Sequence, residues 1–250
     1  MGIERVAIQE NVHRTRARSP WKEHERAIKA GVFVLCLFPL AWLALETWRV
    51  FQGSLALGAN PIRELEIQTG LWTLRFLAIT LAVTPLRELS GIGMLARYRR
   101  MFGLFTFTYA CVHLSMWVGV DWFFDWGEMG REIVKHKYIL VGMATFLMLV
   151  PLAVTSTKGW VRRLGGRRWA RLHQLVYVCA ITGTVHYLWA VKKDTLFPLV
   201  YFTLFAALLG YRLWQRVRER LTPRATRAPQ ASSVSTATTR RAASTRDKAS

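Results

Sequence analysis

The chain has 250 residues and combines a hydrophobic fraction of 52% with a formal net charge of +20. Hydrophobic and basic residues occupy different segments, since long apolar blocks alternate with short polar stretches. This pattern argues against a single soluble domain and is typical of an integral membrane protein. Because the positive charge is spread over several segments rather than gathered on one domain, it does not indicate a nucleic-acid-binding protein.

Six apolar blocks lie between a polar, basic arm at residues 1–29 and a basic tail at residues 214–250. Each block is long enough for a helix to cross a hydrocarbon core of about 30 Å. The predicted spans are residues 30–48, 69–86, 101–120, 138–155, 172–191 and 195–211. We therefore expect an all-α fold, with six transmembrane helices within residues 30–213 and a disordered tail rich in Ser, Thr, Ala and Arg.

Lys and Arg alternate in abundance from one polar segment to the next. Most of the 35 basic residues lie in the arm, in residues 87–100, in residues 156–171 and in the tail from residue 212. The intervening loops have few, and acidic residues dilute the positive charge of the loop at residues 121–137. Under the positive-inside rule, this alternation places both termini in the cytoplasm, where the basic segments also favour contact with anionic membrane lipid.

Two histidines lie deep within predicted spans, where an ionisable side chain normally marks a functional site. His113 is about 18 Å from the cytoplasmic start of the third span, and His186 is about 21 Å from that of the fifth. The two imidazoles are therefore expected at nearly the same depth on different helices. Two histidines in this relation can supply both axial nitrogens to one haem iron, so we predict them as haem ligands.

Small residues precede both histidines by three positions, and they share the helical face of the imidazoles. They are Ala110 in the third predicted span and Gly183 in the fifth. These positions leave room for a flat macrocycle beside the histidines. Close helix packing also uses small residues, so the pattern has two interpretations.

Arg75 is the one basic residue inside a predicted span, at about 9 Å from the outer end of the second span. This depth is close to that predicted for His113 and His186. Because no Asp or Glu lies in the deeper part of any predicted span, the guanidinium needs an anion from elsewhere. A haem propionate fits its planar fork, and the alternative is that the side chain extends to the lipid headgroups.

His173 lies at the cytoplasmic edge of the fifth predicted span, roughly 220° around the helix from His186. The third span offers no histidine at this level, so a second haem in register with the first lacks an obvious ligand. His173 has three interpretations: a haem ligand with an unidentified partner, a contact of a flavin or quinone, or an interfacial histidine.

Three segments carry a family resemblance. They are GLWTLRFLAITLAVTPLREL at residues 70–89, RYRRMFGLFTFTYACVHLSMW at residues 97–117, and the stretch at residues 151–193 that contains RLHQLVYVCAITGTVHYLWAVKK. Together they resemble the haem-binding membrane subunit of the bacterial periplasmic methionine-sulfoxide reductase system, which belongs to the ferric-reductase-like transmembrane group. The resemblance covers roughly residues 72–193 and excludes the arm and the tail.

The resemblance implies a multi-pass b-type cytochrome of the bacterial inner membrane, an electron-transfer subunit without catalytic residues of its own. The haem histidines of the family correspond to His113, His173 and His186, which allows one haem b or two, and FMN is a further cofactor of the family. The implied acceptor is a periplasmic molybdopterin-containing subunit that reduces methionine sulfoxide in oxidised envelope proteins. The implied donor is a cytoplasmic flavin reductase or membrane quinol.

Two alternatives remain open at the level of sequence. The first is a cytochrome of the same architecture with another acceptor, such as a ferric chelate or a quinone pool. The second is a transporter in which His113, His186 and Arg75 line the path of a substrate or of protons.

Overall fold

The computed structural model describes residues 20–53, 57–58, 60–191 and 195–221. Every regular element within these ranges is a helix, which confirms the predicted all-α class. The predicted arm up to residue 19 and the predicted tail from residue 222 lie outside the described residues. The elements in chain order are α2 (Pro20–Phe51), α3 (Pro61–Ser90), η1 (Gly93–Arg97), α4 (Arg99–Ser115), the π-helical turn η2 (Met116–Asp121), α5 (Trp126–Lys135), α6 (Lys137–Val154), α7 (Lys158–Leu164), α8 (Gly166–Leu172), α9 (Leu175–Ala190) and α10 (Leu196–Leu221).

Two helix ends differ from the predicted domain boundaries. α2 begins at Pro20, inside the predicted polar arm, and α10 continues to Leu221, inside the predicted tail. Leu213 and Val217 precede Leu221 at intervals of four, so the apolar spacing of a helix continues past the predicted end. The first residues of the predicted disordered tail are therefore helical.

Five helices are long and apolar enough to cross a membrane, which indicates a multi-pass membrane protein. They are His24–Phe51, Pro61–Ser90, Gly93–Asp121, Lys137–Val154 and Leu196–Leu221. The predicted fifth span corresponds to α9, which has only 16 residues because a turn at His173 and Gln174 interrupts the apolar block. A helix of this length covers about 24 Å, less than a hydrocarbon core of about 30 Å. The structure thus describes five candidate spans rather than the six predicted.

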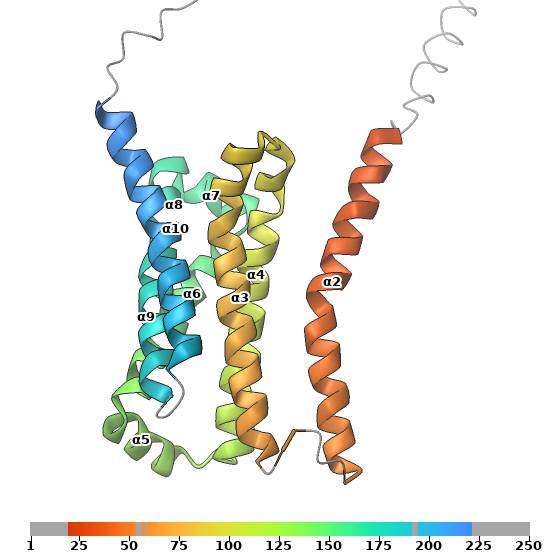
Figure 1. Ribbon diagram of the computed structural model, residues 1–250, viewed down its shortest axis with the longest axis vertical. Coiled ribbons are helices and arrows are strands. Elements are labelled where there is room, and N and C mark those ends of the chain that lie inside the picture. The colour runs from red at the N-terminus through yellow and green to blue at the C-terminus, as the bar shows by residue number, and fades with distance from the viewer. Residues whose placement is uncertain (1–19, 54–56, 59, 192–194, 222–250) are drawn as a thin grey trace, which may run out of the picture. The chain divides into compact units, whose positions relative to one another are not determined.

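Four helices, α3, α4, α6 and α9, form a bundle that contains the candidate site. α3 packs along α4, and α6 packs along α9, whereas contacts between the two pairs are fewer (Figure 1). A buried cluster that includes Leu74, Ala180 and Phe205 joins α3, α9 and the first half of α10. Another joins α2 to the bundle, because the hydroxyl of Tyr109 donates a hydrogen bond of 2.9 Å to the carbonyl of Cys36.

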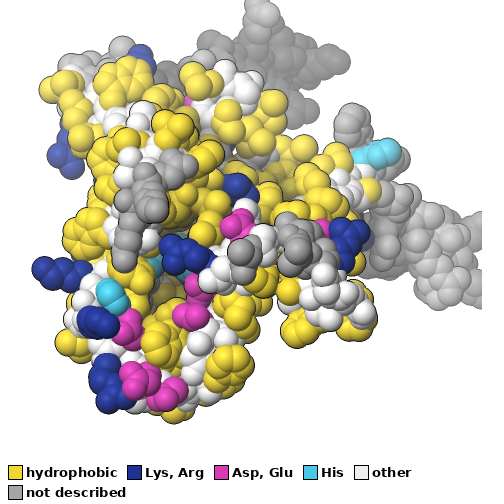
Figure 2. All heavy atoms as spheres, turned by 60° about the horizontal axis from the view of Figure 1, so that its bottom comes forward, with side chains coloured by type: hydrophobic (Ala, Val, Ile, Leu, Met, Phe, Trp, Pro, Cys, Tyr) yellow, Lys and Arg dark blue, Asp and Glu magenta, His cyan; other side chains and the backbone are white. Residues whose placement is uncertain are grey.

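The two ends of the bundle differ in charge. We call the end that carries α5 the α5 side, and the opposite end the α7–α8 side. Figure 2, which turns the α5 side toward the viewer, shows acidic and basic side chains mixed among apolar ones. On the α7–α8 side, the two short helices carry basic residues and no acidic ones. These residues are Lys158, Arg162, Arg163, Arg167, Arg168 and Arg171.

Candidate functional site

His113 on α4 and His186 on α9 lie next to each other inside the four-helix bundle. Their ring centres are 6.3 Å apart, and the ring planes make an angle of 74°. The two residues come from the two different helix pairs, α3–α4 and α6–α9. The sequence predicts these two histidines at the same depth. In the structure they meet where the two helix pairs pack against each other.

The Nδ1 atom of His113 is occupied by the protein. It lies 3.2 Å from the hydroxyl of Thr69 on α3. That hydroxyl is 2.8 Å from the carbonyl of Leu65 and 2.9 Å from the carbonyl of Glu66, and these two acceptors take its one hydrogen. The hydroxyl must therefore accept a hydrogen bond from the Nδ1–H of His113. This tautomer leaves the Nε2 of His113 with a free lone pair.

The Nδ1 atom of His186 is occupied in the same way. It lies 2.6 Å from the carbonyl oxygen of Tyr138 at the start of α6. A carbonyl oxygen only accepts hydrogen bonds, so the Nδ1 of His186 carries the hydrogen and its Nε2 is left unprotonated. Both central histidines thus present the nitrogen that a metal ion binds, and a second residue fixes each ring in that state.

Glycines on neighbouring helices make room for both imidazoles. A Cβ atom added to Gly70 on α3 would lie 3.2 Å from the Cε1 of His113. A Cβ atom added to Gly142 on α6 would lie 2.6 Å from the Nδ1 of His186, a separation that real Cβ atoms essentially never show. The His186 ring can therefore occupy its position only because residue 142 has no side chain.

The paired histidines suit a metal whose other ligands come from a non-protein group. A metal ion bound to two imidazoles through bonds of about 2 Å separates the ring centres by about 6 Å, which agrees with the observed distance. Within the described residues, no group of three or more His, Cys, Asp or Glu side chains is arranged to hold a metal. A metal between His113 and His186 would thus need equatorial ligands from a macrocycle, and a haem supplies them.

Arg75 does not lie at the level of the paired histidines. The His113 ring contacts Thr69 and Gly70, so Arg75 lies about 8 Å further along α3, toward the α7–α8 side. The predicted depth was wrong because α3 begins at Pro61, where the side chain of Asn60 caps the helix, rather than at Thr69.

The guanidinium of Arg75 has a hydroxyl and an aromatic ring as its recorded partners. Its Nε donates a hydrogen bond of 3.2 Å to the hydroxyl of Tyr201 on α10. Its Cζ lies 4.5 Å from the ring centre of Trp72, one helical turn before it. None of the ion pairs within the described ranges includes Arg75.

His173 lies in the turn between α8 and α9, at the opposite end of α9 from His186. Its Nε2 is 3.1 Å from the hydroxyl of Thr155, and that hydroxyl is 2.6 Å from the carbonyl of Pro151, to which it donates. Nε2 of His173 therefore carries a hydrogen and donates it to Thr155. The ring also packs on Trp169, whose indole nitrogen donates to the carbonyl of Thr155 at 2.9 Å.

The small residues that precede the histidines serve helix packing in the structure. A Cβ atom added to Gly183 would make ordinary contact with Leu74 and Thr145 at 3.5 and 3.8 Å, so α9 approaches α3 and α6 closely there. Ala110 belongs to a buried cluster with Leu149 and Cys179. Of the two interpretations of these residues, the structure favours close packing.

Sequence reasoning did not identify the residues that hold the rings, namely Thr69, Gly70, Tyr138, Gly142 and Thr155. The two glycines offered a signal, since each interrupts an apolar helix where glycine is otherwise unfavourable. The contacts of Thr69 and Thr155 with the histidines gave no signal in the sequence, because a threonine in a membrane helix commonly bonds to its own backbone. Tyr138 holds the His186 ring through its backbone carbonyl, and a contact of this kind cannot be predicted from a pattern of side chains.

Comparisons with known proteins agree with this geometry. The family model of the ferric reductase like transmembrane component matches residues 69–184, a range that includes His113 and ends two residues before His186. The protein-methionine-sulfoxide reductase heme-binding subunit MsrQ of Xanthomonas campestris pv. campestris (strain B100) is 48% identical over 204 residues, which cover 81% of this chain and 93% of that protein. The subunit of the same name from Rhodospirillum rubrum is 49% identical over 204 residues, covering 82% of this chain and 96% of that protein.

No solved structure gives a significant match to the chain. The two relatives are matched over nearly their whole length, and the identity is high enough to establish common descent. The chain belongs to the family of protein-methionine-sulfoxide reductase heme-binding subunits, within the ferric-reductase-like transmembrane group.

Proposed function

We propose that this chain is the b-type cytochrome membrane subunit of a methionine-sulfoxide reductase system. It relays electrons across the bacterial inner membrane to a periplasmic molybdopterin-containing subunit, which repairs oxidised envelope proteins. The observation that carries this proposal is the pair His113–His186, with both Nε2 atoms free and the ring centres 6.3 Å apart. The family relationship supports the same conclusion.

His113 and His186 are the residues that would hold one haem b, each through its Nε2 atom. The haem supplies an iron that alternates between the ferric and ferrous states, and two histidine ligands suit electron transfer better than oxygen activation. Thr69 and Tyr138 hold the two rings in the ligating tautomer, and Gly142 admits the His186 ring. The family resemblance implies FMN as a further cofactor, and no residue of this chain is assigned to it.

Arg75 is the proposed partner of a haem propionate. Its side chain is partly buried within the bundle, where a positive charge is costly without an anion. Tyr201 and Trp72 occupy only part of its hydrogen-bonding surface, since a guanidinium has five N–H donors. A carboxylate presented to the remaining donors would form a charge-assisted contact.

His173 has a different proposed role. The described residues contain no histidine near it that could be a second axial ligand, and its Nε2 is bonded to Thr155. We therefore assign one haem to the protein and give His173 the task of tying the α8–α9 turn to the end of α6. This role departs from the ligand role that the family resemblance implies for it.

The proposed topology places the α7–α8 side in the cytoplasm. The two short helices on that side carry basic residues and no acidic ones, as the positive-inside rule requires of a cytoplasmic loop. Both termini are then cytoplasmic, with α9 as a short sixth span. The donor, a cytoplasmic flavin reductase or membrane quinol, acts from that side, and the periplasmic subunit docks on the α5 side.

The ligand assignment is tested with His113→Ala and His186→Ala in protein purified from membranes. We expect each variant to lose most of the haem and of the reduced-minus-oxidised spectrum, while membrane insertion is retained. The matched control is His136→Ala, a histidine on the α5 side that pairs with Glu132 outside the bundle, and it should keep a normal spectrum. Normal haem content in both central variants would refute the assignment, and colourless wild-type protein would favour the transporter alternative.

The acceptor is tested with reduced protein mixed with candidate oxidants. We expect rapid reoxidation by the molybdopterin-containing periplasmic subunit in the presence of methionine sulfoxide, and slow reoxidation by a ferric chelate or a quinone analogue. The reverse order of rates would identify the chain as a cytochrome of the same architecture with another acceptor.

A further inference from the structure

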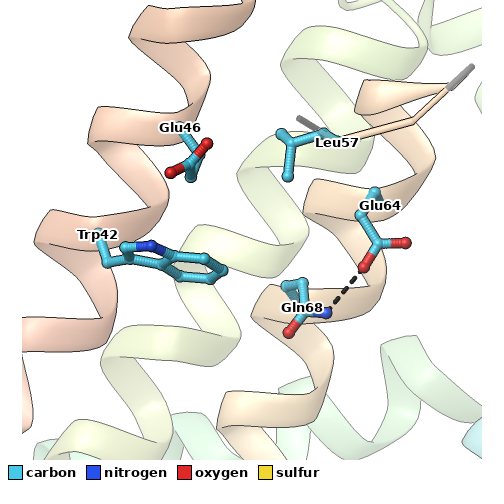
Figure 3. A pocket seen from close by; sticks show the side chains of 5 residues that line it. All are labelled: Trp42, Glu46, Leu57, Glu64 and Gln68. Carbon is cyan, nitrogen blue, oxygen red and sulfur yellow. Dashed lines mark hydrogen bonds between the residues drawn. The ribbon is translucent and has the colours of Figure 1, made fainter. Parts of the chain in front are cut away.

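A cleft of about 410 Å³ opens between α2 and α3, and neither of the paired histidines lines it. It is lined by Trp42 and Glu46 from α2, Leu57 from the connection, and Glu64 and Gln68 from α3. Figure 3 shows the Trp42 ring beside the space between the two helices, with the carboxyl group of Glu46 and the amide of Gln68 facing it from opposite helices. Two carboxylates and one aromatic ring are thus gathered in a single cleft.

The cleft lies near the ends of α2 and α3 on the α5 side. Glu46 is five residues before the end of α2, so its Cα atom is about 7.5 Å from the helix end. Glu64 and Gln68 lie in the first two turns of α3. Both helices meet the α5 side at these ends, so the cleft lies at the depth where hydrocarbon gives way to lipid headgroups.

Glu46 has a buried oxygen without a hydrogen-bond donor. The residue is only 5% exposed. Its Oε1 accepts a hydrogen bond of 2.8 Å from Arg49, while its Oε2 is inaccessible to solvent and has no partner within the described structure. A buried carboxylate oxygen without a donor is costly, so this atom is expected to receive one from a bound molecule.

The charge balance indicates which kind of donor fits. Glu64 also contributes a carboxylate, and its Oε1 accepts a hydrogen bond of 2.7 Å from the amide of Gln68. Within the described residues, Arg49 is the one recorded ion-pair partner of Glu46, and no recorded ion pair includes Glu64. A ligand that brings both N–H donors and a positive charge satisfies Glu46 and balances Glu64, while the Trp42 ring stabilises a cation at its face.

We propose that this cleft binds the primary ammonium group of a phospholipid headgroup, such as that of phosphatidylethanolamine. The ammonium donates to the Oε2 of Glu46, and the outer part of Arg49, which is 55% exposed, faces the lipid phosphate. The surface of α2 beside the cleft is apolar and exposed at Phe38 and Leu45, so it accommodates the acyl chains. A free amine offers the same ammonium group but gains nothing from this apolar surface.

The bound lipid has a structural consequence for α3. Gln68 faces the cleft, and the next residue, Thr69, which lies about 100° further around α3, bonds to His113. A headgroup held between Glu46 and Glu64 ties α2 to α3 at this level. The proposal does not depend on the haem, because every residue that it uses lies on α2, α3 or their connection.

The test uses full-length protein in nanodiscs of phosphatidylcholine alone or with added phosphatidylethanolamine. Lipids that survive gentle detergent extraction are counted by native mass spectrometry. We expect wild-type protein to retain phosphatidylethanolamine over phosphatidylcholine, because a trimethylated headgroup has no N–H to donate to Glu46. Glu46→Gln should reduce that preference by about tenfold, the value of one charge-assisted hydrogen bond.

Trp42→Leu provides a second variant in case Glu46→Gln folds poorly, and it should also weaken the preference. Glu128→Gln, an exposed carboxylate on the α5 side outside the cleft, is the matched control and should leave it unchanged. Equal retention of the two lipids by wild-type protein overturns the proposal, as does an unchanged preference in both cleft variants. Free ethanolamine that displaces the lipid at millimolar concentration would show that the site takes soluble amines instead.

Discussion

The two halves of the bundle hold their histidines in opposite ways. Near the α5 side, Thr69 and Tyr138 occupy the Nδ1 atoms of His113 and His186, which leaves both Nε2 atoms free. Near the α7–α8 side, Thr155 occupies the Nε2 of His173. The Nε2 atom is the ring nitrogen furthest from the backbone. In the half near the α5 side it is left available to a metal, and in the other half it forms a hydrogen bond within the protein. The same residue type is thus prepared as a ligand in one place and as a structural contact in the other.

The surroundings of the rings reinforce this contrast. The imidazoles of His113 and His186 lie against Gly70 and Gly142, whereas His173 packs on the ring of Trp169 with 4.0 Å between centres. Glycine contacts let a ring lie close to the backbone of the neighbouring helix, whereas an aromatic contact covers the face of the ring. The consequences of the contrast can be measured by changing the residues that hold each ring.

The largest effect is expected from Gly142→Ala. The added Cβ would lie 2.6 Å from the Nδ1 of His186, so the ring must move and lose its hydrogen bond to the carbonyl of Tyr138. We expect haem affinity to fall by about 100-fold, at the upper end of losses on removing ligand-orienting contacts. Haem occupancy is measured after purification at equal expression.

Gly103→Ala is the matched control for this variant. Gly103 lies within α4, and an added Cβ there would make only ordinary contact with Thr80 at 3.7 Å. Its haem occupancy should stay at the wild-type level. Full occupancy in Gly142→Ala would mean that the position of the His186 ring is not a condition for haem binding.

A smaller loss is expected from Thr69→Val, which keeps the shape of the side chain and removes the acceptor of the His113 Nδ1–H. We expect haem affinity about tenfold lower and an altered reduction potential, because the ligating tautomer of His113 is no longer favoured. Thr73→Val, one turn further along α3, removes a hydroxyl that bonds only to the backbone and should change neither quantity. If the two variants behave alike, the hydroxyl of Thr69 does not orient the ligand.

The sequence contained enough information for the helical class and for the histidine pair. Continuous apolar blocks admit only helices in a membrane, and helical rise alone placed His113 and His186 at one depth. The sequence also predicted six spans, and five helices within the described residues are long and apolar enough to cross a membrane. The apolar block at residues 172–191 has no charge to mark the turn at His173 and Gln174, because that turn depends on the contact with Thr155.

The depth of Arg75 was also wrong, for a related reason. Hydropathy began the second span at Thr69, yet Asn60 caps the helix two turns earlier and Pro61 begins it. Polar residues such as Glu64 and Gln68 extend this helix beyond its apolar part, so the apolar block underestimates its length. The depth of a residue, when it is counted from the end of an apolar block, is correct only where the helix begins at that end.

Arg75→Leu should affect the potential more than the occupancy. Removing a positive charge about 8 Å along α3 from the level of His113 would lower the reduction potential of a haem held there, by an amount that corresponds to about 1 kcal/mol at an effective dielectric of about 40. Tyr201→Phe, which removes the hydroxyl but keeps the charge, is the control and should shift the potential less. An unchanged potential in Arg75→Leu would indicate that its guanidinium extends to the headgroups and not to a propionate.

The smallest effect on haem is expected from His173→Ala, which sharpens the contrast between the two halves. The variant should keep the full haem-to-protein ratio and lose about 1–2 kcal/mol of stability, because it removes the hydrogen bond to Thr155 and the stacking on Trp169. Thr155→Val removes the same hydrogen bond, so the double variant should be less destabilised than the sum of the two. Loss of half or more of the haem in His173→Ala would make this histidine a ligand and give both halves of the bundle the same role.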